Sequence, residues 1–208
     1  VTSPFGDYIC KKYNVTMKDC LTGFKWIAAI EDEFEKAGTF NYVFGLEESY
    51  GYKVEKEVMD KDGVSAAAMC AEMILYWRSQ GKSLLEHLDD MYKEFGYFED
   101  RAISQNFPGA SGGETMKAMM ASMRNNSPAT LGGEKVVRVR DLMEYPDLPK
   151  SNVRQFYLES GTIVSARPSG TEPKIKFYIN SMVPAGNGTD DWLSEAKVQA
   201  GKLCDGIT

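Results

Sequence analysis

The stretch RPSGTEPKIKFY, residues 167–178, gathers side chains that suit the binding of an anion. A guanidinium, two hydroxyls, an ammonium group and a glycine lie within eight positions: Arg167, Ser169, Gly170, Thr171 and Lys174. A planar guanidinium can donate two hydrogen bonds to phosphate oxygens, and successive backbone amides can form an anion-binding nest. The flanking prolines stiffen the loop, which lowers the entropic cost of binding. The residue types predict a phosphate site, although a polar hairpin with a surface arginine fits them equally well.

A second candidate site is the acidic loop GLEESYGY, residues 45–52. Glu47 and Glu48 are adjacent carboxylates, and Ser49 adds a hydroxyl directly after them. Carboxylates accept hydrogen bonds from vicinal hydroxyls, so this loop suits a polyhydroxyl ligand such as a sugar. Spacing alone fits a solvated acidic turn as well, which is the commoner structure.

Lys25 is a third candidate, because it follows Thr22, the predicted N-cap of a helix, by three positions. A lysine in the first turn opposes the helix macrodipole, and a bound anion would remove that conflict. Surface lysines are tolerated at such positions, so the placement alone does not establish a site.

The remaining reactive residues predict no metal or nucleophilic centre. DKDG, residues 60–63, does not fit an EF-hand loop, and Asp60 or Asp62 is interpreted as the cap of the following helix. His87 is the only histidine, and it falls inside a predicted helix. The four cysteines are scattered and contain no C-x-x-C pair, which favours reduced thiols in a cytoplasmic protein.

Charge and hydropathy exclude several classes of partner. The 208 residues carry 24 basic and 30 acidic side chains, a net charge of −6. Affinity for nucleic acid or for an acidic membrane surface requires a positive footprint, so neither partner is expected. No apolar run approaches the roughly 20 residues that cross a bilayer. No secretory signal pattern follows Val1, and the sequence is expected to be part of a longer chain.

The first half of the chain has an α/β pattern. Apolar residues recur at helical spacing from Thr22 to a stop at Gly38, and again from Asp62 to Gly81. TFNYVF, residues 39–44, is aromatic and β-branched and predicts a strand. Ser83 opens a capping box that predicts a helix ending near residue 95. NFPGASGG, residues 106–113, is rich in glycine and predicts a domain boundary near residue 112.

The second half of the chain is predicted to form a helix, several strands and a final helix. Two helices are predicted, over 113–126 and 190–206, and four strands between them, over 134–143, 153–160, 161–168 and 174–181. The strand at 174–181 alternates apolar and polar residues, as a half-buried strand does. This order predicts an antiparallel sheet covered by helices on one face.

Four stretches, taken in order, resemble the phosphoglucomutase branch of the α-D-phosphohexomutase superfamily. They are LTGFKWI (21–27), FGLEESYGY (44–52), DKDGVSAA (60–67) and RPSGTEPKIKFY (167–178). The resemblance implies that residues 1–112 form most of the third domain, an α/β unit whose mixed sheet is truncated at its N-terminal side. It implies that residues 113–208 form the fourth domain, an antiparallel sheet of the TATA-box-binding-protein-like type.

The resemblance also assigns roles to the candidate residues. It implies that Glu47, Glu48 and Ser49 bind sugar hydroxyls. It implies that a second set binds the substrate phosphate that is not reacting: Lys25, Arg167, Ser169, Gly170, Thr171 and Lys174. Enzymes of this superfamily interconvert sugar 1-phosphates and sugar 6-phosphates through a bisphosphorylated sugar.

Two family elements are missing from this sequence. The serine loop that carries the phosphoryl group and the acidic magnesium loop have no match in it. The fragment is therefore expected to be inactive alone, with Mg²⁺ and glucose 1,6-bisphosphate acting only in the full-length parent. The expected partners are a phosphosugar and the missing N-terminal domains of the same enzyme. The Glu-Glu-Ser loop resembles that of phosphoglucomutases, but mannose and pentose phosphates stay open, as does a non-catalytic phosphosugar-binding module.

Overall fold

The first 95 residues are mainly helical in the computed structural model, which describes residues 1–146 and 148–208. Four helices occupy this part: α1 (Phe5–Lys12), α2 (Phe24–Ala37), α3 (Gly63–Ser79) and α4 (Leu84–Phe95). Their ends follow local chemistry. Gly38 ends α2 with a φ of 62°, a left-handed conformation that glycine adopts without strain. Asp62 caps α3 by accepting hydrogen bonds from two backbone amides, and Ser83 forms the predicted capping box with Glu86 at the start of α4.

A short hairpin is the only sheet in this part among the residues that the structure describes. Its strands are β1 (Gly45–Glu47) and β2 (Gly51–Lys53), which pair antiparallel. The predicted strand over 39–44 is wrong, because these residues form no backbone ladder. Their aromatic side chains make the contacts instead: Tyr42 donates its hydroxyl to the Lys53 carbonyl at 2.6 Å, and Phe40 packs against Phe34 of α2.

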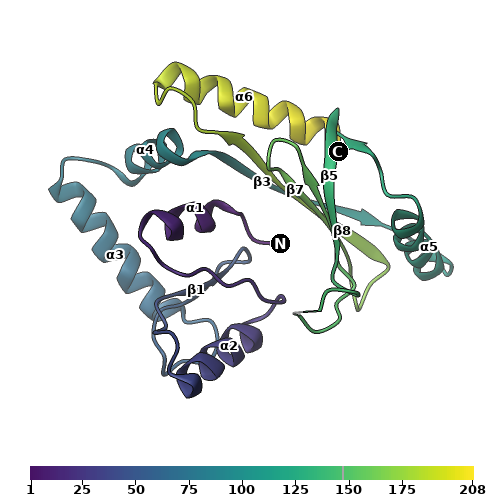
Figure 1. The fold of residues 1–208 in the computed structure, drawn as a ribbon, viewed down its shortest axis with the longest axis horizontal. Helices are drawn as coiled ribbons and strands as arrows, with labels where there is room; N and C mark the ends of the chain where they lie inside the picture. Colours follow the sequence, from purple (N-terminus) through teal and green to yellow (C-terminus); the bar gives the residue numbers. More distant parts are fainter. Residues whose placement is uncertain (147) are drawn as a thin grey trace.

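The rest of the chain builds one six-stranded sheet (Figure 1). Its strands are β3 (Gly96–Asn106), β4 (Thr130–Leu131), β5 (Glu134–Asp141), β6 (Arg154–Leu158), β7 (Ile163–Pro168) and β8 (Lys174–Pro184). They lie in the order β3-β8-β7-β6-β5-β4, and every neighbouring pair is antiparallel.

Strand β3 was not predicted from the sequence, and it bears on the domain boundary. It pairs with β8 along its whole length, from Gly96 opposite Pro184 to Asn106 opposite Lys174. The sheet thus includes residues on both sides of position 112. The boundary at 112 stays a prediction, and the strand pairing favours one that precedes Gly96.

Helices α5 (Gly112–Asn125) and α6 (Asp190–Ile207) cover one face of this sheet. A buried cluster forms the core between them and the strands: Phe156, Leu158, Val164, Ile179, Leu203 and Cys204. Side chains alternate across a strand, so apolar residues at every second position of β6, β7 and β8 fall on this covered face. An antiparallel sheet with helices on one face, after an α/β part, confirms the predicted fold class.

The opposite face of the sheet turns toward the N-terminal half of the chain. Phe98 of β3 stacks against Phe5 of α1 at a centroid distance of 4.7 Å, and Tyr8 contacts the edge of the same ring. Figure 1 shows α1 on the side of the sheet away from α6. The β1–β2 hairpin and α2 lie on this same side of the sheet (Figure 1). No helix among the described residues is long and apolar enough to cross a membrane.

Candidate functional site

The loop between β7 and β8 has a shape set by its own hydrogen bonds. The Ser169 amide donates to the Lys174 carbonyl at 2.9 Å, which closes the loop at its base. The Ser169 hydroxyl accepts hydrogen bonds from the amides of Thr171 and Glu172, both at 3.3 Å. The loop is therefore ordered before any ligand binds, which lowers the cost of binding.

The outer side of this loop is open to a ligand. Gly170 and Thr171 are exposed, and a methyl group added at Gly170 would meet no atom within 4 Å. Lys174 forms an ion pair with Glu172, whose pKa is lowered by that hydrogen bond and charge. Lys174 thus has part of its charge neutralised within the loop, while Arg167 forms no ion pair with the described residues.

Arg167 faces a second cation across the strands. The register of β7 and β8 places Arg167 directly opposite Lys176. Like charges at directly opposed positions repel each other in an antiparallel pair. Neither side chain forms an ion pair with any residue that the structure describes. A bound anion would relieve this repulsion. Sequence reasoning treated Lys176 only as a polar residue of an alternating strand, and its pairing with Arg167 became evident from the sheet register.

The acidic loop is the turn of the β1–β2 hairpin. Glu47 ends β1, while Glu48 and Ser49 lie in the exposed turn, where the Ser49 hydroxyl donates to the Glu48 carboxylate at 3.3 Å. Only 14% of the Glu47 side chain is exposed, and its carboxylate forms an ion pair with Lys61. The hairpin thus presents two carboxylates differently, one held in place by a lysine and one free in the turn.

Gly51 allows the hairpin to pack closely against α2. A Cβ atom at this position would lie 2.8 Å from the Glu47 Cγ and 2.5 Å from the Phe24 ring. Lys61 approaches the same ring, with its Nζ 5.8 Å from the centroid. Lys61 lies in the DKDG stretch, whose residue types predict a helix cap and which belongs to one of the four family-like stretches, but no site role is predicted for Lys61. Its contact with Glu47 joins two stretches that are separated in the sequence.

Lys25 lies at the start of α2 and directly follows Phe24, whose ring packs against Gly51 of the hairpin. It is exposed, its Nζ lies 5.1 Å from the centroid of the Trp26 ring, and it forms no ion pair among the described residues. The N-cap is Gly23 with a φ of 116°, and not the predicted Thr22, so no side chain caps the first turn. The Trp26 amide donates to the Gly23 carbonyl at 2.9 Å, so the group at this end of α2 that is available to an anion is the Lys25 ammonium group.

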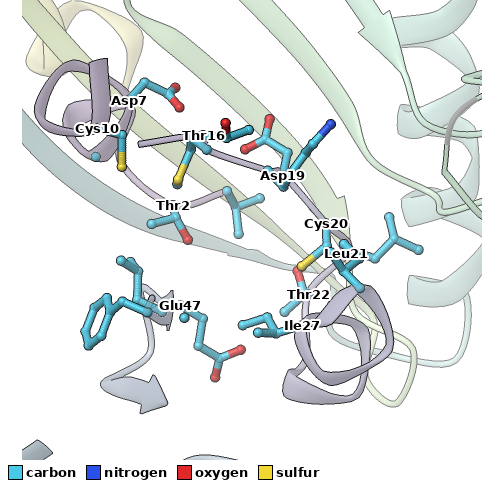
Figure 2. Close-up of a pocket in the computed structure, with 18 of the residues that line it drawn as sticks. Thr2, Asp7, Cys10, Thr16, Asp19, Cys20, Leu21, Thr22, Ile27 and Glu47 are labelled. Atoms are coloured by element: carbon cyan, nitrogen blue, oxygen red, sulfur yellow. The ribbon is translucent and has the colours of Figure 1, made fainter. Parts of the chain in front are cut away.

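A cavity of about 370 Å³ separates the hairpin from the open face of the sheet (Figure 2). The acidic loop contributes Glu47, Glu48 and Ser49 to its wall, while β6 and β8 contribute polar side chains such as Gln155 and Asn180. Figure 2 shows Glu47 on one side of this space and Asp19 and Cys20 on another.

The phosphate loop 167–174 contributes no residue to the wall of this cavity. Arg167 leaves the same face of the sheet as Gln155 and Asn180, which do line it, because Ser165 pairs with Gln155, Ile163 pairs with Asn180 and side chains alternate along β7. The sheet therefore directs Arg167 toward the side on which the cavity lies.

The other reactive residues lie apart from this site or lack a partner set. His87 stacks on Trp77 at 3.5 Å, and burial lowers its pKa. The four cysteines form no disulfide within the described residues: Cys10, Cys20, Cys70 and Cys204. In residues 1–146 and 148–208, no three side chains of the histidine, cysteine, aspartate or glutamate type are grouped to hold a metal ion.

Comparison with known proteins gives a consistent set of relatives. Residues 1–95 match the family model "Phosphoglucomutase/phosphomannomutase, alpha/beta/alpha domain III". A probable phosphomannomutase from Haemophilus influenzae is 36% identical over 196 residues, covering 94% of this chain and 38% of its own length. A phosphoglucomutase from Staphylococcus haemolyticus is 32% identical over 192 residues, covering 86% of this chain and 34% of its own length.

A solved structure supports the fold over nearly the whole chain. The phosphoglucomutase pp63/parafusin from Paramecium, in its open form, has a TM-score of 0.65 at 16% identity. The match covers 99% of this chain and 37% of the Paramecium protein. The chain thus spans little more than a third of the length of these relatives.

Proposed function

Because the chain belongs to the phosphoglucomutase/phosphomannomutase family, we propose that it is the substrate-recognition part of a phosphohexomutase. The parent enzyme would interconvert sugar 1-phosphates and sugar 6-phosphates through a bisphosphorylated sugar, as an intramolecular phosphotransferase. These 208 residues would bind the sugar hydroxyls and the phosphate that is not reacting. The division of roles rests on two loops of different chemistry, one in the wall of the cavity and one whose arginine faces the same side of the sheet.

The observation that carries this proposal is the unneutralised charge at the 167–174 loop. Arg167 and Lys176 lie opposite each other without a carboxylate partner in the described part of the chain, beside an open glycine and two hydroxyls. A dianionic phosphate would accept hydrogen bonds from the guanidinium and the hydroxyls and would offset the repulsion. Charge-assisted hydrogen bonds of this kind are each worth roughly 1.5–3 kcal/mol.

The acidic hairpin would orient the sugar by accepting hydrogen bonds from its hydroxyls. Glu47 is held in place by Lys61, so it would keep one direction while the ligand is exchanged. Glu48 and Ser49 in the exposed turn would adapt to the remaining hydroxyls. Anchoring the phosphate at one loop and the hydroxyls at the other would present the reacting end of the sugar to the rest of the enzyme.

Magnesium and the nucleophile are assigned to the parent enzyme outside these residues. Mg²⁺ prefers several oxygen ligands in octahedral geometry, and the described residues contain no grouped set of carboxylates that fits it. The chain also offers no sequence match to a phosphoryl-carrying serine loop. Other parts of the parent enzyme would therefore make and break the phosphate bonds, while this chain would hold the sugar in place.

Titration of the chain with glucose 6-phosphate and glucose 1-phosphate, followed by NMR, tests the proposal. We expect binding in the millimolar range, since half of a cleft supplies about 4 kcal/mol at most. Arg167→Gln should weaken binding at least about tenfold, the effect of losing one charge-assisted contact. Arg78→Gln is the control, because Arg78 is an exposed arginine in the last turn of α3. Equal affinities of wild type and Arg167→Gln would contradict the assigned role.

A further inference from the structure

Arg140 is a largely buried arginine whose hydrogen-bonding capacity is not used. It lies near the end of β5, its side chain is only 16% exposed, and its guanidinium stacks on the Tyr145 ring at 3.9 Å. Its Nε is buried and has no hydrogen-bond partner in residues 1–146 and 148–208. A buried donor without a partner is uncommon in proteins, and it calls for an explanation.

The ion pair of Arg140 is weak by geometry. Its Nη1 lies 3.8 Å from the Asp19 carboxylate, too far for a hydrogen bond, and the Asp19 side chain is 71% exposed. Exposed ion pairs of this length contribute little to stability. Asp19 therefore balances part of the charge of Arg140 without fixing the direction of its donors, which leaves them available to a ligand.

Arg140 lines the same cavity as the acidic hairpin. It contributes to the wall opposite Glu47, Glu48 and Ser49, on the sheet side of the space. The cavity is thus bordered by carboxylates from one half of the chain and by a guanidinium from the other. Such a border suits a ligand that carries both hydroxyls and an anionic group.

The sheet register places Arg140 on the same face as Arg167. Arg140 pairs with Gln155 of β6, and Gln155 pairs with Ser165 of β7. Arg167 follows Ser165 by two residues, so its side chain leaves the same face of the sheet. Two strand spacings across and two residues along separate the two backbone positions by about 12 Å. Two arginine side chains can reach a common ligand over that separation.

We propose that Arg140 is a second arginine of the phosphosugar-binding site and donates hydrogen bonds to a phosphate oxygen of the bound ligand. The inference rests on the proposed function and extends it to a residue of β5, outside both loops. The ligand would replace the distant Asp19 as the partner of the guanidinium and would satisfy the buried Nε.

The test is a titration of the 208-residue chain with glucose 1-phosphate, followed by NMR, for wild type and three variants. Arg140→Gln removes the charge and the fork of donors, and we expect the dissociation constant to rise about tenfold. Arg138→Gln is the matched control on the same strand. Arg138 is exposed and stacks on Tyr157 at 3.7 Å without lining the cavity, so its loss should change the constant less than twofold. Arg167→Gln tests whether the 167–174 loop binds the phosphate.

The outcomes separate this inference from the proposed function. Weaker binding in both Arg140→Gln and Arg167→Gln, with Arg138→Gln unchanged, supports it. Weaker binding in Arg167→Gln alone overturns the role of Arg140 and leaves the proposed function standing. No binding by the wild type, or no effect of Arg167→Gln, overturns both. Amide spectra and melting curves of each variant confirm folding, and Arg140→Lys replaces Arg140→Gln if the latter unfolds, with an expected partial loss of affinity because lysine lacks the fork.

Discussion

The ion pair beneath the acidic hairpin gives a sharp prediction about stability. Lys53 of β2 is fully buried, and its Nζ lies 2.5 Å from the Oε2 of Glu31 on α2. The same ammonium group donates to the Glu55 carbonyl at 2.8 Å and lies 4.1 Å from the centroid of the Tyr42 ring. In the described part of the chain, the Glu31 carboxylate has no partner other than Lys53. The pair therefore joins the hairpin to α2 at a site without solvent.

Removing one member of the Glu31–Lys53 pair should lower the free energy of unfolding far more than removing both. Lys53→Met leaves the Glu31 carboxylate buried and uncompensated, a loss of about 3–5 kcal/mol in the free energy of unfolding. The double variant Glu31→Leu/Lys53→Met replaces two buried charges by apolar side chains, which is often neutral or stabilising. It should recover most of the stability lost in the single variant. Urea denaturation followed by circular dichroism measures both differences.

A matched exposed pair supplies the control. Lys36 and Asp32 lie one turn apart on α2, with side chains 74% and 51% exposed, and Lys36→Met should cost less than about 1 kcal/mol. If Lys53→Met is no more damaging than Lys36→Met, the Glu31–Lys53 pair does not join the hairpin to α2 as argued. If the double variant is less stable than Lys53→Met alone, the loss comes from packing rather than from an uncompensated charge.

Two further predictions concern the hairpin and the acid stability of the sheet. Gly51→Ala should lower the free energy of unfolding by about 1–3 kcal/mol, because its methyl group would press on the Phe24 ring and on Glu47. Gly63→Ala should not lower the free energy of unfolding in this way, because the added Cβ meets no atom within 4 Å. Equal urea midpoints for Gly51→Ala and Gly63→Ala would contradict this interpretation. Burial raises the pKa of Asp141, but hydrogen bonds from Arg124 and Arg154 outweigh it and hold that pKa below its ordinary value. This stabilisation is present above the unfolded pKa near 3.9 and is lost as pH falls through the folded pKa. Asp141→Asn should therefore reduce the loss of the free energy of unfolding between about pH 5 and pH 2. The same pH dependence of stability in Asp141→Asn and in the wild type would contradict this prediction.

Local chemistry allowed three helix ends to be predicted from the sequence, at Gly38, Asp62 and Ser83, whereas the predicted N-cap Thr22 was wrong. Gly38, Asp62 and Ser83 act through residues one to four positions away, so their roles can be inferred without a fold. The residue types of the two loops are equally local. The strand prediction over Phe40 and Tyr42 failed, because a run of aromatic residues fits a strand whether it pairs through its backbone or packs through its side chains.

The further residues of the proposed site are brought to it by contacts between distant parts of the sequence. Lys61 meets Glu47 only once the hairpin has folded back on the start of α3. Lys176 faces Arg167, and Arg140 shares a sheet face with it, only in the register of the six-stranded sheet. The sequence does not show which residue of a neighbouring strand lies opposite a given polar residue. Lys61, Lys176 and Arg140 were therefore not identified as site residues.

The central claim is that the two loops form one binding site, and amide chemical-shift mapping tests it directly. Glucose 6-phosphate added to the isotopically labelled chain should shift the amides of the acidic loop 45–52 and of the phosphate loop 167–174 together. Both sets should follow one dissociation constant, since one molecule would contact both loops. Inorganic phosphate should shift the 167–174 loop and leave the acidic loop unchanged. Shifts confined to one loop, or two unrelated dissociation constants, would contradict a shared site.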